Sequence, residues 1–240
     1  MDRVIGINPV IEALRNRENN IEKIEIYKGA RDERLLLVKK LAGERNIRIF
    51  YTDKRTLNSQ GVSLILSEYN YYLEFGEMLE RLAPMKKCIA LVLDEIQDPH
   101  NLGAIIRSAE VFGVGGIILP ERNAARISET VVKTSTGAIE HVPICKVINI
   151  SLALDRLKTL GFWIYGAEGS AGRDFSEEPY ADRAVLVLGN EGRGIRKKVR
   201  EHCDVLVKIP MYGKINSLNV SVACGVILSG IARAHHTITR

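Results

Sequence analysis

Three short apolar runs, each followed at once by glycine and polar residues, constrain the fold of this chain more than any other feature. They lie at residues 88–93, 184–188 and 205–209 of a 240-residue sequence. A run of this length bounded by turn-forming residues is typical of a strand buried within a sheet. Ligands of open α/β sheets bind beyond the carboxyl ends of the strands, so the polar residues after these runs are the first candidates for a site.

A helical pattern follows the first run. Asp98, Pro99 and Asn101 supply turn and cap chemistry at its start. One apolar face is then formed at helical spacing by Leu102, Ile105, Ile106, Ala109 and Phe112. Arg107 lies off that face. Taken alone, the stretch is equally consistent with a capped helix that carries an exposed arginine.

Strand-like runs and helical patterns alternate along the chain, which predicts an α/β protein. From residue 88 onward we expect about six parallel strands and a last helix over about 219–234. The first part of the chain predicts a small α/β unit, with helices beginning near Asn8 and Asp32 and a short one after Asp53.

The best boundary in the chain is Pro84, which is followed by Met85 and two lysines. Proline and charged residues are typical of segments between domains. We therefore expect a small domain at 1–75, a linker at 76–87 and a larger domain at 88–240.

Composition limits the partners and the compartment. A net charge of +5 and a pI of about 9.0 are compatible with an RNA partner but do not demand one. The four cysteines lie in or beside apolar runs without a Cys-x-x-Cys pair, so we expect buried thiols rather than a metal site. Neither a secretory segment nor an apolar run of roughly 20 residues is present, which predicts a cytoplasmic protein without membrane contact.

Several common chemistries lack their sequence motif. The chain contains no P-loop, no dinucleotide-binding Gly-x-Gly-x-x-Gly after a first strand, and no Gly-x-Ser-x-Gly elbow. The five histidines show no metal-ligand spacing. These absences disfavour NTPases, dehydrogenases, α/β-hydrolases and metalloenzymes.

The residues after the three runs carry a more specific signal. They read Asn-Leu-Gly-Ala-Ile-Ile-Arg-Ser-Ala from residue 101, Gly-Asn-Glu-Gly-x-Gly from 189 and Ile-Pro-Met-x-Gly-x-x-x-Ser-Leu-Asn-Val-Ser from 209. These segments resemble the three signature motifs of the SpoU (TrmH-type) RNA 2′-O-methyltransferases of the SPOUT superfamily. The resemblance implies methyl transfer from S-adenosylmethionine to a ribose 2′-hydroxyl. It also implies a trefoil knot in the parallel-sheet domain, which chain physics alone would not predict because knots are nearly absent from proteins.

The amino-terminal segment 4–14 resembles the opening of the substrate-binding domain in the ribosomal-RNA branch of this family. This implies a guanosine of 23S ribosomal RNA, or of a precursor particle, as the target. A transfer-RNA methyltransferase of the same family, an antibiotic-resistance methyltransferase and a non-catalytic ribosome-assembly module remain alternatives. The candidate RNA contacts of the small domain are Arg15, Arg17, Lys28, Arg31, Lys54 and Arg55.

The resemblance carries catalytic roles, motif by motif, to Asn101, Arg107, Glu191, Ser217 and Asn219. One proposal in the family makes the arginine a general base. A guanidinium stays protonated in proteins, however, so Arg107 is better suited to gripping a phosphate and stabilising a developing alkoxide. Glu191 could orient Arg107 or accept a proton, and the sequence leaves both roles open.

Other residues are expected to bind the cofactor and the RNA. The cofactor candidates are Gly189, Ile209, Leu218, Met211, Thr136, Gly137, Gly166 and Ala167. The basic run beside Glu191 is expected to contact the RNA backbone, and it consists of Arg193, Arg196, Lys197, Lys198 and Arg200. The resemblance, and a last helix whose apolar residues spread over more than one face, predict a homodimer formed through the larger domain.

Overall fold

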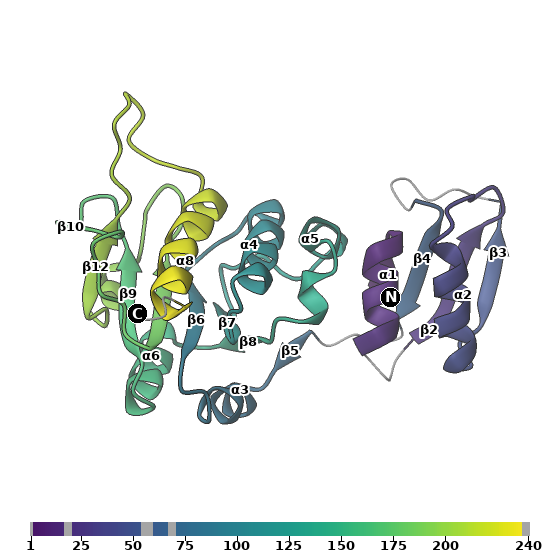
Figure 1. The fold of residues 1–240 in the computed structure, drawn as a ribbon, viewed down its shortest axis with the longest axis horizontal. Helices are drawn as coiled ribbons and strands as arrows, with labels where there is room; N and C mark the ends of the chain where they lie inside the picture. Colours follow the sequence, from purple (N-terminus) through teal and green to yellow (C-terminus); the bar gives the residue numbers. More distant parts are fainter. Residues whose placement is uncertain (1, 17–20, 54–59, 67–70, 237–240) are drawn as a thin grey trace.

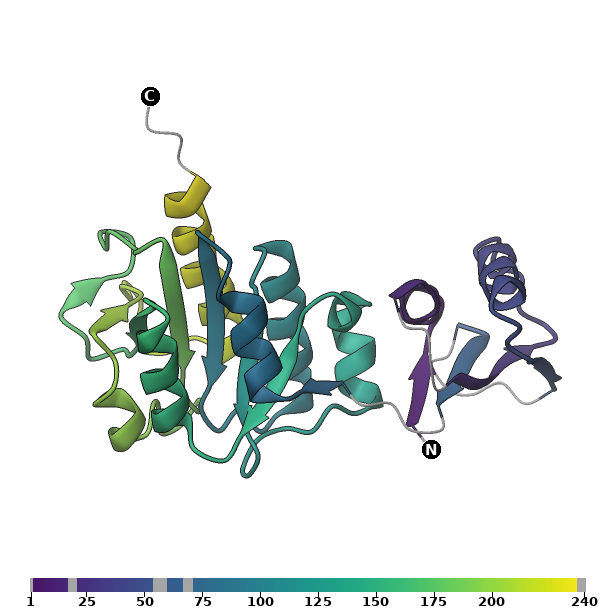
Figure 2. The same ribbon diagram turned by 90° about the horizontal axis from the view of Figure 1, so that it is seen from below.

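The computed structural model describes residues 2–16, 21–53, 60–66 and 71–236, which form two α/β units (Figures 1 and 2). The smaller unit has a four-stranded sheet in the order β1-β4-β2-β3. In it β4 runs antiparallel to both β1 and β2, and β3 runs parallel to β2. Its elements are β1 (Asp2–Ile5), α1 (Ile7–Asn16), β2 (Ile21–Tyr27), α2 (Leu35–Glu44), β3 (Ile49–Thr52) and β4 (Val62–Leu66).

The two expected helices of the smaller unit are present, and both cover one face of its sheet (Figure 1). Helix α1 begins directly after Gly6, whose φ of +102° makes the sharp turn out of β1. Asp32 lies just before α2, where its carboxylate accepts a hydrogen bond from the backbone N–H of Arg34 at 3.0 Å. The expected helix after Asp53 falls largely outside the described residues, as do Arg17, Lys54 and Arg55.

The larger unit has an eight-stranded sheet in the order β10-β12-β9-β11-β6-β7-β8-β5, and every neighbouring pair is parallel. The predicted parallel α/β fold is confirmed. We expected about six strands, and the two more are β5 and β10, which are too short for any periodic pattern. The elements are β5 (Tyr72–Leu73), α3 (Phe75–Leu82), β6 (Cys88–Leu93), α4 (Pro99–Val111), β7 (Gly116–Pro120), α5 (Glu129–Ser135), η1 (Ala138–Glu140), β8 (Ile144–Val147), α6 (Ile150–Thr159), β9 (Trp163–Ala167), β10 (Arg173–Asp174), β11 (Arg183–Leu188), α7 (Lys197–Arg200), β12 (Val205–Lys208) and α8 (Val220–His236).

Helices cover both faces of the larger sheet (Figure 2). Alternate residues of β6 show this, because Ile89, Leu91 and Leu93 pack with α4, α5 and α8. Cys88, Ala90 and Val92 instead pack with α3, α6 and α7. A strand buried on both faces has no polar alternation, which is why it reads as a continuous apolar run.

The expected linker at 76–87 is wrong for most of its length. Helix α3 occupies Phe75–Leu82, and its Met78 and Leu82 are fully buried against the larger sheet. The strand before it, β5, pairs with β8 of the same sheet. Pro84 therefore follows a helix of the larger unit, and the chain passes between the two units earlier, between β4 and β5.

The order of the last elements brings distant segments together. Strand β11 lies between β6 and β9, and β12 is added outside β9. Helix α8 then returns to pack on α4 and β11. The segments that follow β11 and β12 therefore lie beside the segment that follows β6, as expected for a site at strand ends. The trefoil knot itself stays a prediction.

The smaller unit contacts the larger one through α1 and β1, which lie beside α5 and η1. The Glu12 carboxylate lies 2.9 Å from His141 Nε2 across this contact. Gly137, with a φ of +99°, approaches the same glutamate so closely that an added Cβ would lie 3.0 Å from its Cγ.

Candidate active site

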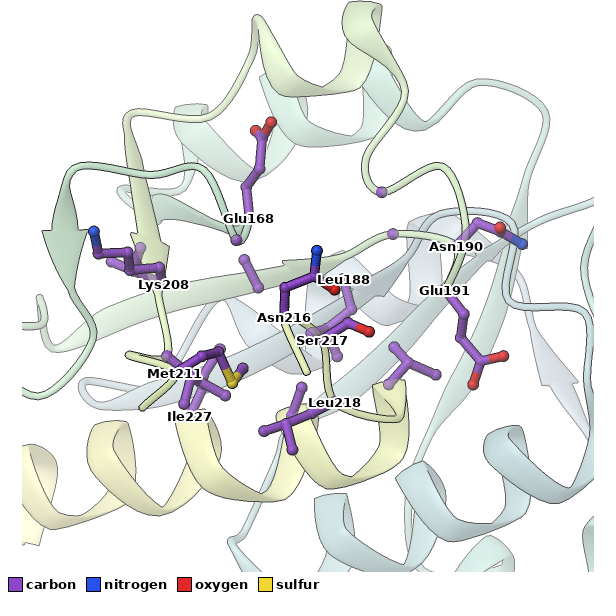
Figure 3. Close-up of a pocket in the computed structure, with 18 residues that line it drawn as sticks. Glu168, Leu188, Asn190, Glu191, Lys208, Met211, Asn216, Ser217, Leu218 and Ile227 are labelled. Atoms are coloured by element: carbon purple, nitrogen blue, oxygen red, sulfur yellow. The ribbon is translucent and has the colours of Figure 1, made fainter. Parts of the chain in front are cut away.

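A cavity of about 160 Å³ lies at the carboxyl ends of β9, β11 and β12, beside the start of α8 (Figure 3). Of the residues expected to bind the cofactor, Ala167, Gly189, Ile209, Met211 and Leu218 line it. Its other lining residues include Glu168, Gly169, Leu188, Asn190, Glu191, Gly194, Val207, Lys208, Asn216, Ser217, Val220, Ala223 and Ile227. The walls are thus mainly apolar or glycine, and most of the polar side chains come from the second and third motif segments.

Three of the expected catalytic side chains meet at the rim of this cavity. Asn101 Nδ2 donates to Glu191 Oε1 at 2.5 Å. Asn219 Nδ2 donates to Asn101 Oδ1 at 2.9 Å and to Glu191 Oε1 at 3.1 Å. Each residue comes from a different motif, so the cluster exists only because β6, β11 and α8 are brought together by the fold.

Asn219 also caps α8. Its Oδ1 accepts hydrogen bonds from the backbone N–H of Ser221 at 2.9 Å and from the Ser221 hydroxyl at 2.6 Å. An amide side chain offers an acceptor for the helix and a donor for the site at the same time. Aspartate would cap the helix equally well but could not donate to Asn101 and Glu191.

The loop that carries Glu191 is closed on itself. Asn190 and Gly194 form two backbone hydrogen bonds, at 3.1 and 2.8 Å. A Cβ at Gly189 would lie 2.1 Å from the carbonyl carbon of Gly194, so no larger residue fits there. The glycines of this motif therefore serve a tight loop that holds Glu191 at the cavity.

Arg107 is exposed on α4. It has no hydrogen bond or ion pair with any residue that the structure describes, so it is not joined to the cluster of Asn101, Glu191 and Asn219. Six residues of helix separate it from Asn101, or about 9 Å along the axis. Its guanidinium is free to meet a ligand. Ser217, by contrast, lines the cavity directly.

The basic run separates into two groups. Arg196 is bound to Asp94, and Arg200 lies 2.9 Å from the Glu168 carboxylate. Arg193, Lys197 and Lys198 are exposed, and within the described parts of the chain their side chains have no hydrogen-bond partner or ion pair. The sequence pattern could not separate these groups, because their partners lie far away along the chain.

Three of the expected cofactor residues lie away from the cavity. Thr136 and Gly137 follow α5, and Gly137 lies against Glu12 of the smaller unit. Gly166 is buried in β9, where an added Cβ would lie 2.7 Å from Leu206 and 2.9 Å from the Cys203 sulfur. Its small size serves packing of the sheet.

Sequence reasoning did not single out Asp94, Asn190 or Asn216, which lie at or next to the site. One signal was available for Asp94: a carboxylate that ends an apolar run has to be paired when it is buried. Asn190 and Asn216 lie inside the second and third motifs, and no spacing rule distinguishes them from ordinary loop residues.

Two absences hold for the part of the chain that the structure describes. No group of three or more His, Cys, Asp and Glu side chains could hold a metal ion. No helix in that part is long and apolar enough to span a bilayer.

Comparisons with known proteins agree with this architecture. Residues 88–229 match the SpoU rRNA Methylase family, and residues 3–72 match the family described as RNA 2′-O ribose methyltransferase substrate binding. A Bacillus subtilis protein assigned to the TrmH family of tRNA/rRNA methyltransferases is 36% identical over 99% of this chain and 97% of its own length.

Two solved structures illustrate the likeness. An rRNA methyltransferase from Sinorhizobium meliloti, solved with bound AdoMet, is 24% identical with a TM-score of 0.80, over 99% of this chain and 88% of that one. The A. aeolicus TrmH/SpoU tRNA modifying enzyme is 34% identical with a TM-score of 0.56, over 67% of this chain and 83% of that one. The family match over more than half of the chain, together with the full-length relative, shows that the chain belongs to the SpoU family of S-adenosylmethionine-dependent RNA 2′-O-methyltransferases.

Proposed function

We propose that this enzyme methylates the ribose 2′-hydroxyl of a guanosine in 23S ribosomal RNA, in the cytoplasm. The observation that carries the proposal is the hydrogen-bonded cluster of Asn101, Glu191 and Asn219 at the rim of the cavity. A protein that only binds RNA would not need one side chain from each of three distant segments to meet beside a cofactor site.

The lining residues fit S-adenosylmethionine. Leu188, Ile209 and Leu218 offer apolar walls for an adenine ring, and the glycines allow close backbone approach. The cavity of about 160 Å³ is below the roughly 300 Å³ of the smallest typical ligand pockets. We therefore expect the exposed segment 211–218 to move outward when the cofactor binds.

The cofactor supplies an electrophilic methyl group on a sulfonium, and the protein has to place and deprotonate the hydroxyl. Glu191 is exposed at the cavity rim, and both amides bind its Oε1, so none of the described residues occupies Oε2, which can accept a hydrogen bond from an RNA hydroxyl. Arg107, which is exposed and has no partner among the described residues, grips a phosphate and stabilises the developing alkoxide. Arg193, Lys197 and Lys198 bind the RNA backbone.

The two-unit architecture favours ribosomal RNA over transfer RNA. The S. meliloti rRNA methyltransferase matches the fold over 99% of this chain, whereas the A. aeolicus tRNA modifying enzyme covers 67% of it. The smaller unit matches the family described as RNA 2′-O ribose methyltransferase substrate binding. We propose that it recognises structured ribosomal RNA.

Labelled methyl transfer to separate pools of ribosomal and transfer RNA, followed by mapping of the modified nucleotide, tests the proposal. We expect label in 23S RNA at a guanosine ribose, and about 100-fold less with Glu191→Gln, the scale for losing one electrostatic group in a site. Label found only in transfer RNA would overturn the ribosomal assignment. If Glu191→Gln turned over as fast as the unaltered protein, the Glu191 carboxylate would have no role in the chemical step.

We also propose a homodimer formed through the larger unit. In α8, Val220, Ile227 and Ile231 are buried in the core, but Val222 is 50% exposed. Tyr212 and Ile215 of the neighbouring segment are 94% and 77% exposed. Light scattering at micromolar concentration should give twice the monomer mass, and Val222→Asp should shift the mass toward that of the monomer. A monomer mass for the unaltered protein would contradict the proposal.

A further inference from the structure

We infer that Arg196 is a positioning residue, which braces the loop of Glu191 through the buried Asp94 and does not contact RNA. The inference rests on the proposed catalytic role of Glu191. It reassigns one member of the basic run and adds Asp94, which no motif singled out, to the machinery of the site.

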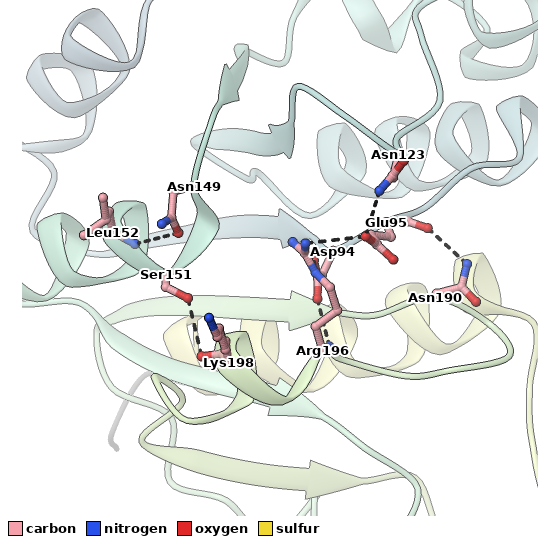
Figure 4. A network of polar contacts seen from close by, with 9 residues as sticks. All are labelled: Asp94, Glu95, Asn123, Asn149, Ser151, Leu152, Asn190, Arg196 and Lys198. Atoms are coloured by element: carbon pink, nitrogen blue, oxygen red, sulfur yellow. Dashed lines mark hydrogen bonds and ion pairs between the residues drawn. The ribbon is translucent and has the colours of Figure 1, made fainter.

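The contacts of Arg196 are mainly with Asp94, which is 0% exposed at the end of β6 (Figure 4). The backbone N–H of Arg196 donates to Asp94 Oδ2 at 2.9 Å, and Nε donates to Oδ1 at 2.8 Å. Nη2 lies 2.6 Å from the same Oδ1. This hydrogen bonding with Asp94 raises the pKa of Arg196 above its usual value. A buried carboxylate needs such a partner, because an unpaired one is strongly destabilising.

Glu95 forms a second link between the segment that follows β6 and the loop that carries Glu191. Arg196 Nη1 lies 3.4 Å from Glu95 Oε1, so every nitrogen of the guanidinium faces a carboxylate. The Glu95 carbonyl accepts a hydrogen bond from Asn190 Nδ2 at 3.1 Å. The φ of Glu95, +62°, is unusual for a residue other than glycine. The Asn123 amide, which donates to Glu95 Oε1 at 3.2 Å, helps to hold that side chain.

These two links, Asn190 with Glu95 and Arg196 with Asp94, lie on either side of Glu191 in the sequence. Strands β6 and β11 are paired with Leu93 opposite Leu188, so Asp94 and Gly189 leave the sheet side by side. Asn190 anchors the start of the Glu191 loop to Glu95, and Arg196 anchors its end to Asp94. Glu191 lies between these anchors and reaches Asn101 at the start of α4. Together, these contacts hold the first and second motifs at a fixed distance from each other.

The neighbouring lysines have the opposite surroundings. Lys197 and Lys198 are exposed and, among the described residues, their side chains bind no acidic group, whereas the Arg196 nitrogens are engaged. A phosphate would have to compete with two carboxylates for Arg196. Lys197→Ala is thus a contrasting variant, because it removes a positive charge that is exposed to RNA one residue away from Arg196.

The test compares Arg196→Lys with Lys197→Ala in single-turnover methylation at saturating RNA and S-adenosylmethionine. Lysine keeps a charge beside Asp94 but loses the planar fork, so Glu191 shifts. We expect the rate to fall about 10- to 100-fold, as for a misplacement near 1 Å. RNA affinity and its salt dependence should stay unchanged. Lys197→Ala, which removes a proposed phosphate contact, should instead weaken RNA binding and lower the salt slope.

A second comparison separates positioning from general stability. If Arg196 acts through Glu191, adding Arg196→Lys to Glu191→Gln should cost little further rate, whereas a general structural defect would multiply the two losses. Should Arg196→Lys fold poorly by thermal unfolding, the paired change Asp94→Asn with Arg196→Gln leaves no buried charge and is expected to show the same rate loss. Weakened RNA binding with a normal saturated rate, or fully multiplicative losses, would overturn the inference. The unaltered protein, assayed alongside, tests the methyltransferase assignment separately.

Discussion

The active site of the larger unit and the surface of the smaller unit hold their polar side chains in different ways. In the larger unit, Asp94 and Asn101 are buried at strand ends and bonded to residues about 90 to 100 positions away. In the smaller unit, charged side chains such as Lys28 and Asp53 pair at the exposed surface. Burying a polar group costs free energy unless it is bonded, whereas an exposed pair contributes only about 0–1 kcal/mol. The larger unit thus holds a fixed chemical site, and the smaller one offers a surface that RNA can contact.

Replacement of Arg107 should give the largest effect, because it removes a charge from the side of the fixed site. Arg107→Ala should lower the rate of methyl transfer by about 100-fold or more, the scale for losing one electrostatic donor. The side chain is exposed and has no partner among the described residues, so the melting temperature should hardly change. Single-turnover methylation and thermal unfolding of the same samples check both expectations.

Arg107→Lys is the matched control, since lysine keeps the charge without the planar fork. Partial recovery of the rate by lysine would favour simple charge stabilisation. A recovery that grows toward high pH would favour base chemistry instead. Normal turnover by Arg107→Ala would exclude Arg107 from the mechanism and leave Glu191 as the main candidate for the residue that acts on the 2′-hydroxyl.

The second-largest effect is expected from removal of the smaller unit, which tests whether that unit contributes to RNA binding. A chain that begins at Tyr71 retains β5 and α3, which belong to the larger sheet. It should fold, and S-adenosylmethionine should raise its melting temperature by as much as that of the full-length protein. Its affinity for RNA should fall by on the order of 10-fold, because the basic side chains of the smaller unit no longer bind phosphates. Full-length rates at low RNA concentration would show that the smaller unit does not read the substrate.

The same contrast explains what the sequence could and could not predict. Apolar runs such as 184–188 follow from burial on both faces, so the parallel α/β fold and the polar strand ends were predictable. The linker prediction failed because Pro84 follows the end of helix α3, and a proline has the same appearance after a helix as between domains. The separation of Arg196 from Lys197 was not predictable, since the partner of Arg196 lies 102 positions away.

Lys197 and Lys198, whose side chains have no partner in the described part of the chain, give a smaller expected effect. Changing Lys197 and Lys198 together to alanine should reduce the slope of log affinity against log salt by about two units, because each lysine that binds a phosphate contributes about one. Arg200→Ala, the control, removes a charge that is already paired with Glu168 and should leave the slope unchanged. An unaltered slope in the double variant would place both lysines on a solvated surface.

The smallest expected effect is a loss of stability at alkaline pH. It arises in the larger unit and does not involve the active-site residues. All four cysteines lie in the larger unit, and burial raises the pKa of Cys88 from 9.0 to about 11 and that of Cys224 to about 12. A raised folded-state pKa stabilises the fold fully below the unfolded value, and this contribution is lost as pH rises from about 9 toward 11–12.

Each such thiol should lower the free energy of unfolding by up to about 1.4 kcal/mol per pH unit in that window, with no effect at neutral pH. Trp163, the single tryptophan, reports on the larger unit by fluorescence. Denaturant unfolding at pH 8 and pH 10.5 should therefore show a loss of stability, and Cys224→Ala should reduce the loss. A pH dependence that Cys224→Ala leaves untouched would assign the alkaline effect to groups other than this thiol.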